Sequence, residues 1–466
     1  MSLSPRFEDW APTLVGEGYS EAYLEESRAN SLHFEDSRLT EMSSGSDRGA
    51  CLRYLFDDPE SPEGPPRTVH GSLNSLEAGA ARALAERLLG KGARRAPPRA
   101  AAARRSEAVV LRDPFGVATE EKVALLAAAD RAARAESAHV IQVDITYAER
   151  RKSYAVLNSD GEQRAHARST VIFVVSVTAA KDGVLQTGTE VLGSLKGFEL
   201  SGALDPVRAA GAAARLAVEK LSAPVARAGE MPVVLAASAG GTFVHEAIGH
   251  SLEADHVQEG SSPHYVGKLG KVVAPEFLSI VDDPTLPFAR GSYPFDDEGC
   301  PARPTPLVQN GVLVDYLYDR VTARRGKAEP NAHGRRESFR HRPIPRMSNL
   351  YIAPGKDDPA DILRSLDRGL LVTRMGGGQV NTATGEFVFG VDEGFWVEGG
   401  KIRHRVRDAN MLGVGPEVLA SIDRLGWDIG WGIGTCGKDG QGVPVSDGQP
   451  TLRIPKLLIG GREEGA

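Results

Sequence analysis

Two histidines near the middle of the chain constrain its fold more than any other feature. His245 and His250 lie five positions apart in the segment GGTFVHEAIGHSLEAD at residues 240–255, and Glu246 directly follows the first of them. The common zinc motif His-Glu-x-x-His places its histidines four positions apart, on one face of a helix. Five steps leave the two side chains about 140° apart on a regular α-helix. The spacing therefore predicts a helix widened toward a π-helix near residues 247–249, where Gly249 would make the distortion easier. The alternative is a regular buried helix with two unrelated histidines.

A catalytic zinc ion needs more than these two histidines, because it typically has three protein ligands and an open position for water. Cys436 lies in a glycine-rich segment, residues 430–440, that we expect to be a loop. Cys300 follows carboxylates that would raise the pKa of its thiol. Glu253 would either bind the metal itself or accept a hydrogen bond from the His250 imidazole and so fix its tautomer. The candidates for the third ligand are Cys300, Cys436, Glu253, Asp255 and His256.

The pattern of apolar residues predicts an α+β fold in two domains. Residues 1–225 combine helices at 76–89, 119–137 and 205–221 with alternating strands, which indicates an α+β domain with an antiparallel sheet. Asp205 and Pro206 give the third helix an N-cap and a proline at its first position. Residues 228–466 are rich in glycine, proline and β-branched residues, and we expect a mainly β domain that carries the histidine helix.

Charge and motif context exclude several classes of function. The formal net charge of −7 argues against a dedicated nucleic-acid binder. The basic segment 91–105 has no interleaved aromatic residues, and we expect a solvated connector there. A second basic segment, residues 335–342, is either a solvated surface or an anchor for a substrate carboxylate. Residues 432–437 match the dinucleotide pattern Gly-x-Gly-x-x-Gly, but we reject that interpretation because no helix is expected after them.

Cysteine usage and hydropathy bear on location. Three cysteines are few and odd in number, which suits a reducing compartment. The amino terminus has no apolar signal core, and the longest apolar run, residues 171–180, is far too short to span a membrane. We therefore expect a cytoplasmic protein with no membrane partner.

Further short motifs follow the histidine segment in order along the C-terminal half. They are Ile-Val-Asp-Asp at 280–283, Asp-Asp-Glu-Gly at 296–299, Gln-Asn-Gly-Val-Leu at 309–313, Gly-Arg-Arg-Glu-Ser at 334–338, Pro-Arg-Met-Ser-Asn at 345–349 and Cys-Gly-Lys-Asp-Gly-Gln-Gly at 436–442. Together with His-Glu-Ala-Ile-Gly-His-Ser-Leu-Glu at 245–253, they resemble the TldD/PmbA peptidases, specifically the metal-bearing TldD-type subunit. The resemblance spans essentially the whole C-terminal half and is weak over residues 1–225.

This resemblance implies a zinc-dependent metallopeptidase, with Zn²⁺ on His245, His250 and Cys436 and with Glu246 as general base on a zinc-bound water. It also implies an unfolded protein or leader peptide as substrate. The implied partner is a metal-free PmbA/TldE-type paralogue in a heterodimer, or a second copy in a homodimer. The glycine-rich segment 375–380 would bind an extended peptide by adding it to a sheet edge. The competing hypotheses are a non-peptidase zinc amidohydrolase and a catalytically idle scaffold or binding subunit.

Overall fold

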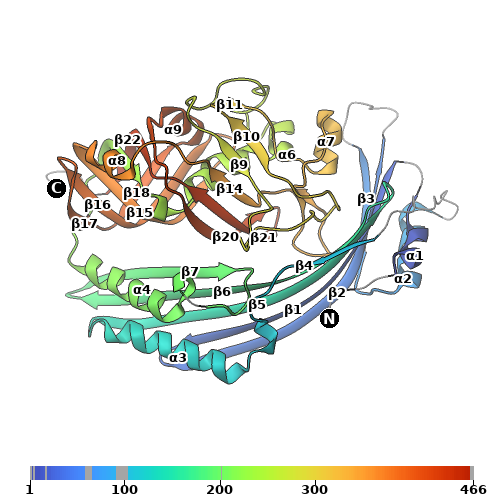
Figure 1. Ribbon diagram of the computed structural model, residues 1–466, viewed down its shortest axis with the longest axis horizontal. Coiled ribbons are helices and arrows are strands. Elements are labelled where there is room, and N and C mark those ends of the chain that lie inside the picture. The colour runs from blue at the N-terminus through green and yellow to red at the C-terminus, as the bar shows by residue number, and fades with distance from the viewer. Residues whose placement is uncertain are drawn as a thin grey trace.

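A long, curved sheet dominates the first half of the computed structural model (Figure 1). The structure describes residues 3, 6–15, 18–57, 66–90, 103–200 and 202–461. The strand order is β3-β2-β1-β5-β6-β4, and β7 also pairs with β6. All pairs are antiparallel except β4 with β6. The strands are β1 (Tyr19–Glu35), β2 (Arg38–Phe56), β3 (Arg67–Leu73), β4 (Arg104–Glu107), β5 (Val140–Asn158), β6 (Gln163–Lys181) and β7 (Val184–Ser194).

Helices cover the outer face of this sheet (Figure 1). Near one end, α3 (Thr119–Ala135) and α4 (Pro206–Leu221) bury apolar side chains against β1, β5 and β6. The Asp205 carboxylate accepts hydrogen bonds from the amides of Val207 and Arg208, which confirms the predicted N-cap. At the other end, α1 (Phe7–Trp10) and α2 (Ala78–Leu89) form a separate core with β1 and β2, and η1 (Ala11–Thr13) directly follows α1.

Two further large sheets make up the second half. One has the order β11-β10-β9-β14-β21-β20. The other has the order β15-β8-β22-β18-β16-β17, and because β15 also pairs with β16, five of its strands close into a ring. The strands are β8 (Gly229–Leu235), β9 (Ile280–Asp282), β10 (Thr305–Gln309), β11 (Val312–Leu313), β14 (Asn349–Ile352), β15 (Arg368–Val380), β16 (Glu386–Glu398), β17 (Lys401–Val406), β18 (Ala409–Val414), β20 (Gly430–Lys438), β21 (Gln441–Gln449) and β22 (Leu452–Gly460).

The remaining short elements connect these sheets. The pair β12 (Gly334–Arg335) and β13 (Ile344–Pro345) forms a small antiparallel sheet, and β19 (Arg424–Leu425) pairs with β22. The helices are α5 (Thr242–Val244), α6 (Ala254–Gln258), α7 (Arg320–Gly326), α8 (Pro359–Arg364) and α9 (Gly415–Ser421). Apolar residues of the histidine segment belong to the largest apolar core. The helices and sheets described above confirm the α+β class and the mainly β second half. The chain division at residues 225–228 stays a prediction.

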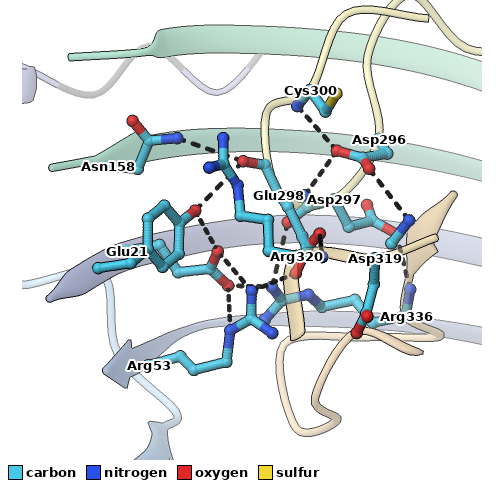
Figure 2. Close-up of polar contacts among 12 residues, drawn as sticks. Glu21, Arg53, Asn158, Asp296, Asp297, Glu298, Cys300, Asp319, Arg320 and Arg336 are labelled. Atoms are coloured by element: carbon cyan, nitrogen blue, oxygen red, sulfur yellow. Dashed lines mark hydrogen bonds and ion pairs between the residues drawn. The ribbon is translucent and has the colours of Figure 1, made fainter. Parts of the chain in front are cut away.

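Buried charges join the two halves (Figure 2). Arg53 on β2 pairs with Glu21 on β1 at 2.9 Å and with Glu298 from the second half. Arg336 reaches the same Glu21 carboxylate at 2.5 Å. Arg335 and Arg336 are each only 2% exposed, so a solvated surface was the wrong expectation for these two residues. The compensating carboxylate of Arg336, that of Glu21, lies far away in sequence, so the charges near Arg336 in the sequence do not reveal it.

Two expectations concern segments of special composition. Residues 91–102 of the first basic segment lie outside the described residues, and residues 104–107 form β4. Within the described part of the chain, no helix is both long and apolar enough to cross a bilayer.

Candidate metal centre

The helix that carries the two histidines is distorted between them. A π-helix, η5 (His245–Gly249), follows α5 and is followed by a single 3₁₀ turn, η6 (His250–Leu252). This confirms the predicted widening. The centroids of the two imidazole rings lie 5.2 Å apart and the rings are nearly perpendicular, at 88°. The five-residue spacing thus brings both rings to one side of the segment.

Gly249 serves this arrangement through its small size and not through an unusual backbone. Its φ of −57° and ψ of −51° are ordinary helical values. A Cβ atom at this position would lie 2.1 Å from the Met347 sulfur and 2.7 Å from a Leu350 methyl carbon. The glycine therefore lets the π-helix pack closely on the chain around β14.

Cys436 completes a cluster of three potential metal ligands. Its sulfur lies 3.4 Å from Nε2 of His250, and one ligand atom from each of His245, His250 and Cys436 lies within 4.8 Å of the others. All three residues are buried. The cluster combines the distorted helix with a strand almost two hundred residues later in the chain.

The segment around Cys436 is a strand, so the expected loop was wrong. β20 pairs with β21 along its whole length, with Cys436 opposite Val443, and forms the edge of its sheet. Its glycines allow close backbone contact, since a Cβ on Gly430 would lie 2.0 Å from the Ala237 carbonyl oxygen. A hairpin and not a helix follows Gly437, which agrees with the rejection of a dinucleotide site.

Carboxylates lie beside both imidazoles outside the cluster, and one of them forms a hydrogen bond. Nδ1 of His250 lies 3.0 Å from Oε2 of Glu253, which leaves Nε2 for the cluster. Nδ1 of His245 lies 3.8 Å from Oδ2 of Asp447 on β21 and is buried without a hydrogen-bond partner in the described structure. The Glu253 carboxylate also lies 3.1 Å from the Lys438 ammonium group. Asp447 was not among the predicted residues.

The electrostatics of the cluster favour a thiolate. Burial alone would raise the pKa of Cys436, but the two neighbouring imidazoles outweigh burial and hold this pKa well below its usual range. Burial also opposes ionisation of Glu253, yet Lys438 and His250 keep the pKa of its carboxyl low. Zinc binds thiolate sulfur and imidazole nitrogen, and carboxylates beside the ligand histidines are typical of zinc sites. The donor set therefore fits a zinc ion.

Glu246 lies beside the cluster but outside the potential ligand set. Its Oε1 is 4.0 Å from Nε2 of His245, and its side chain is 28% exposed. A carboxylate in this position is accessible to water and close to the ligand nitrogens. The geometry suits a proton acceptor at the edge of the centre.

The other predicted ligand candidates lie elsewhere. The Cys300 thiol contacts the Pro330 carbonyl, and burial together with Asp296 raises its pKa to about 12, which agrees with the expected direction. Asp255 accepts a hydrogen bond from Lys438 at 2.7 Å, and Nδ1 of His256 lies 3.1 Å from the His250 carbonyl. None of these three residues belongs to the cluster found in the described part of the chain.

The fold and the site together define an α+β protein with a candidate metal centre of two imidazoles and one thiolate. Three consecutive family models match the chain: PmbA/TldA metallopeptidase domain 1 at residues 20–89, the central domain at 112–221 and the C-terminal domain at 228–461. The chain belongs to the TldD/PmbA metallopeptidase family.

The names of similar proteins agree with this assignment. The metalloprotease TldD homolog of Haemophilus influenzae is 38% identical over 349 residues, which are 73% of this chain and 72% of that protein. A metalloprotease of Methanothermobacter thermautotrophicus is 33% identical and covers 95% of both chains. These names describe metalloproteases, so a metal ion is implied for the family.

Solved structures support the fold. A Thermotoga maritima protein described as a putative modulator of a DNA gyrase has a TM-score of 0.77 at 23% identity, with 95% of this chain and 96% of that chain covered. TldE from Thermococcus kodakarensis has a TM-score of 0.70 at 18% identity, with 96% and 97% covered. At these identities the similarity shows a shared architecture.

Proposed function

We propose that this chain is a zinc-dependent metallopeptidase that hydrolyses peptide bonds in unfolded polypeptides or leader peptides. One observation carries the proposal: His245, His250 and Cys436 present ligand atoms within 4.8 Å of one another, with the Glu246 carboxylate 4.0 Å from His245. The three residues would hold the ion. The membership of a metallopeptidase family supports the peptide bond as the target.

The proposed roles follow from the surroundings of each side chain. A zinc ion at this position would supply Lewis acidity toward a water molecule and a peptide carbonyl. Glu246 accepts the proton of the attacking water and passes it to the leaving amine. Glu253 fixes the orientation of the His250 imidazole, and the Asp447 carboxylate lies 3.8 Å from Nδ1 of His245. The thiolate of Cys436 contributes a negative charge to the ligand set.

An exposed strand edge supports binding of an extended peptide. On β15, residues 370–372 pair with β8, whereas residues 378–380 pair only with β16 among the described strands. Gly377, Gly378 and Gln379 are exposed. We propose that a peptide adds to this edge as a further strand. The protein would then recognise backbone groups of the peptide and accept many sequences.

The decisive experiment measures bound zinc and peptide cleavage on the same protein preparations. We expect Glu246→Gln to keep about one zinc per chain and to lose cleavage by at least a hundredfold, because general-base catalysis contributes about 10²–10⁴-fold. Cys436→Ser should lose most zinc. Cys300→Ser is the matched control, since the Cys300 thiol lies outside the cluster and should leave both quantities unchanged.

The outcomes separate the competing functions. Full cleavage by Glu246→Gln would exclude the proposed mechanism. Zinc binding with hydrolysis of small amides but not of unfolded peptides would indicate an amidohydrolase. A purified protein without metal, or with cellular function unaffected by Glu246→Gln, would indicate a scaffold or binding subunit.

We also propose a heterodimer with a metal-free PmbA/TldE-type paralogue, with a homodimer as the alternative, in the cytoplasm. The structural similarity to TldE supports such a partner, because both chains share one architecture. The three unpaired cysteines suit a reducing compartment. Light scattering of the chain alone and after mixing with the paralogue distinguishes the two assemblies by mass.

A further inference from the structure

A small pocket lies between the long sheet and the β20–β21 hairpin, which face each other in Figure 1. Its volume is about 40 Å³. It is lined by Arg150 and Lys152 of β5, Arg168 and Thr170 of β6, Arg336, Glu337, and Gly442 and Pro444 of β21. Four of these eight residues carry a positive charge and one carries a negative charge, in a chain whose net charge is −7.

The register of the sheet places like charges opposite each other. Lys152 of β5 pairs with Arg168 of β6, and both side chains are buried, at 5% and 9% exposure. Like charges directly opposite in an antiparallel pair are destabilising. Burial, opposed in part by Glu25, and the positive charges of Arg150 and Arg168 leave the pKa of Lys152 below its usual value. Glu25 lies beside Lys152, so the charge of the pair that still needs compensation is that of Arg168.

The carboxylates around the pocket compensate its cations unevenly. Glu25 lies 3.4 Å from Arg150 and 3.1 Å from Lys152, so one carboxylate serves two cations. The Glu21 carboxylate neutralises Arg336, and the Asp297 carbonyl accepts a hydrogen bond from its guanidinium (Figure 2). Glu337 accepts a hydrogen bond from the Gly442 amide at 2.6 Å.

Among the four cations that line the pocket, only Arg168 has no carboxylate partner in the described structure. One of its nitrogens, Nη1, donates to the Ser292 carbonyl at 3.2 Å, and no acidic group of the described residues lies within 4.0 Å of its guanidinium. The adjoining Arg290 and Arg335 also bind only carbonyl and hydroxyl oxygens within the described structure. A guanidinium offers five donors in a planar fork that matches a carboxylate or a phosphate. The remaining donors of Arg168 are available to such a group.

We propose that this pocket, the Arg168 pocket, binds an anionic oxygen group, either a carboxylate or a phosphate, through the guanidinium of Arg168. The ligand supplies the negative charge that Arg168 lacks. The site lies on the opposite face of the β20–β21 hairpin from Cys436, because Gly442 and Pro444 flank Val443, the partner of Cys436. The proposal is independent of the proposed peptidase activity.

The test measures binding by calorimetry with inorganic phosphate, and with alanyl peptides that end in a free carboxylate or in an amide. Wild type should bind saturably, and Arg168→Gln should bind at least tenfold more weakly. Arg151→Gln is the matched control, since Arg151 is the neighbouring arginine on β5 but bonds to Asp113 and Ser169 on the other face of the sheet. It should bind as wild type does.

The outcomes identify the source of the anion. Binding of phosphate alone indicates a free phosphate, and binding of the acid peptide but not the amide indicates a peptide carboxylate. No saturable binding of any probe, or equal weakening by both substitutions, overturns the proposal. If Arg168→Gln does not fold, Arg168→Lys keeps the charge and loses the planar fork, and it should also weaken binding.

Discussion

Nδ1 of His250 lies 3.0 Å from Oε2 of Glu253, three residues farther along the chain. This contact fixes the imidazole so that Nε2 points toward Cys436. We expect Glu253→Gln to lower zinc affinity by about 10–100-fold, the usual effect of removing such a partner. Competition with a chelator measures the affinity. Asp255→Asn is the control, because Asp255 contacts the same Lys438 but not the imidazole, and equal losses in both variants would contradict the assignment.

Close packing at the π-helix predicts the effect of a single methyl group. Gly249→Ala would place a Cβ 2.1 Å from the Met347 sulfur, and we expect a loss of about 1–3 kcal/mol in the free energy of unfolding. Urea titration followed by circular dichroism measures it. Gly79→Ala in α2 meets no atom within 4 Å and should be neutral or slightly stabilising. Unchanged stability in Gly249→Ala would contradict the packing described for this segment.

The buried ion pairs that Arg53 forms with Glu21 and Glu298 join the two halves, and stability should depend on the Arg53 side chain. Arg53→Met leaves the buried carboxylates of Glu21 and Glu298 without their shared partner, and we expect a loss of about 3–5 kcal/mol in the free energy of unfolding. Arg340→Met removes an exposed pair with Asp47 and should cost less than about 1 kcal/mol. Thermal unfolding of the two variants side by side tests the difference. Similar melting temperatures would show that the ion pairs of Arg53 contribute little to stability.

A buried histidine predicts how stability depends on pH. Burial, followed by the charge of Arg168, lowers the pKa of His166 to about 3. Between this value and the ordinary value of about 6.5, the unfolded chain binds a proton that the native protein does not. Stability should therefore fall as pH decreases through this window, by about 1.4 kcal/mol per pH unit from this residue. His166→Gln should flatten the slope of the melting temperature between pH 4 and 6.5, and an unchanged slope would refute the prediction.

The spacing of residues that are close in sequence predicted the part of the site that those residues form. The five-residue separation of His245 and His250 led to the π-helix, since only a widened turn brings both rings to one side. The N-cap at Asp205 followed from the same kind of short-range chemistry. Such features depend on neighbours within one or two turns, which a single sequence displays directly.

Features that depend on distant partners could not be predicted in this way. Asp447 faces His245 only because β21 runs beside the histidine helix, and nothing around Asp447 marks it as such a partner. The glycines near Cys436 indicated a loop, whereas they allow an edge strand to pack closely on the Ala237 backbone. Arg335 and Arg336 were expected at a solvated surface or as an anchor for a substrate carboxylate. Both are buried, because their partners come from elsewhere in the fold.

The alternation of side chains along the β20–β21 hairpin has a consequence for the evolution of this chain. Cys436 and Val443 face the histidines, whereas Gly442 and Pro444 face the long sheet. Insertion or deletion of one residue in β20 would exchange the two faces, turning the thiol toward the arginines and an adjacent side chain toward the imidazoles. A change of one residue in the length of β20 should therefore be tolerated only where a β-bulge absorbs it.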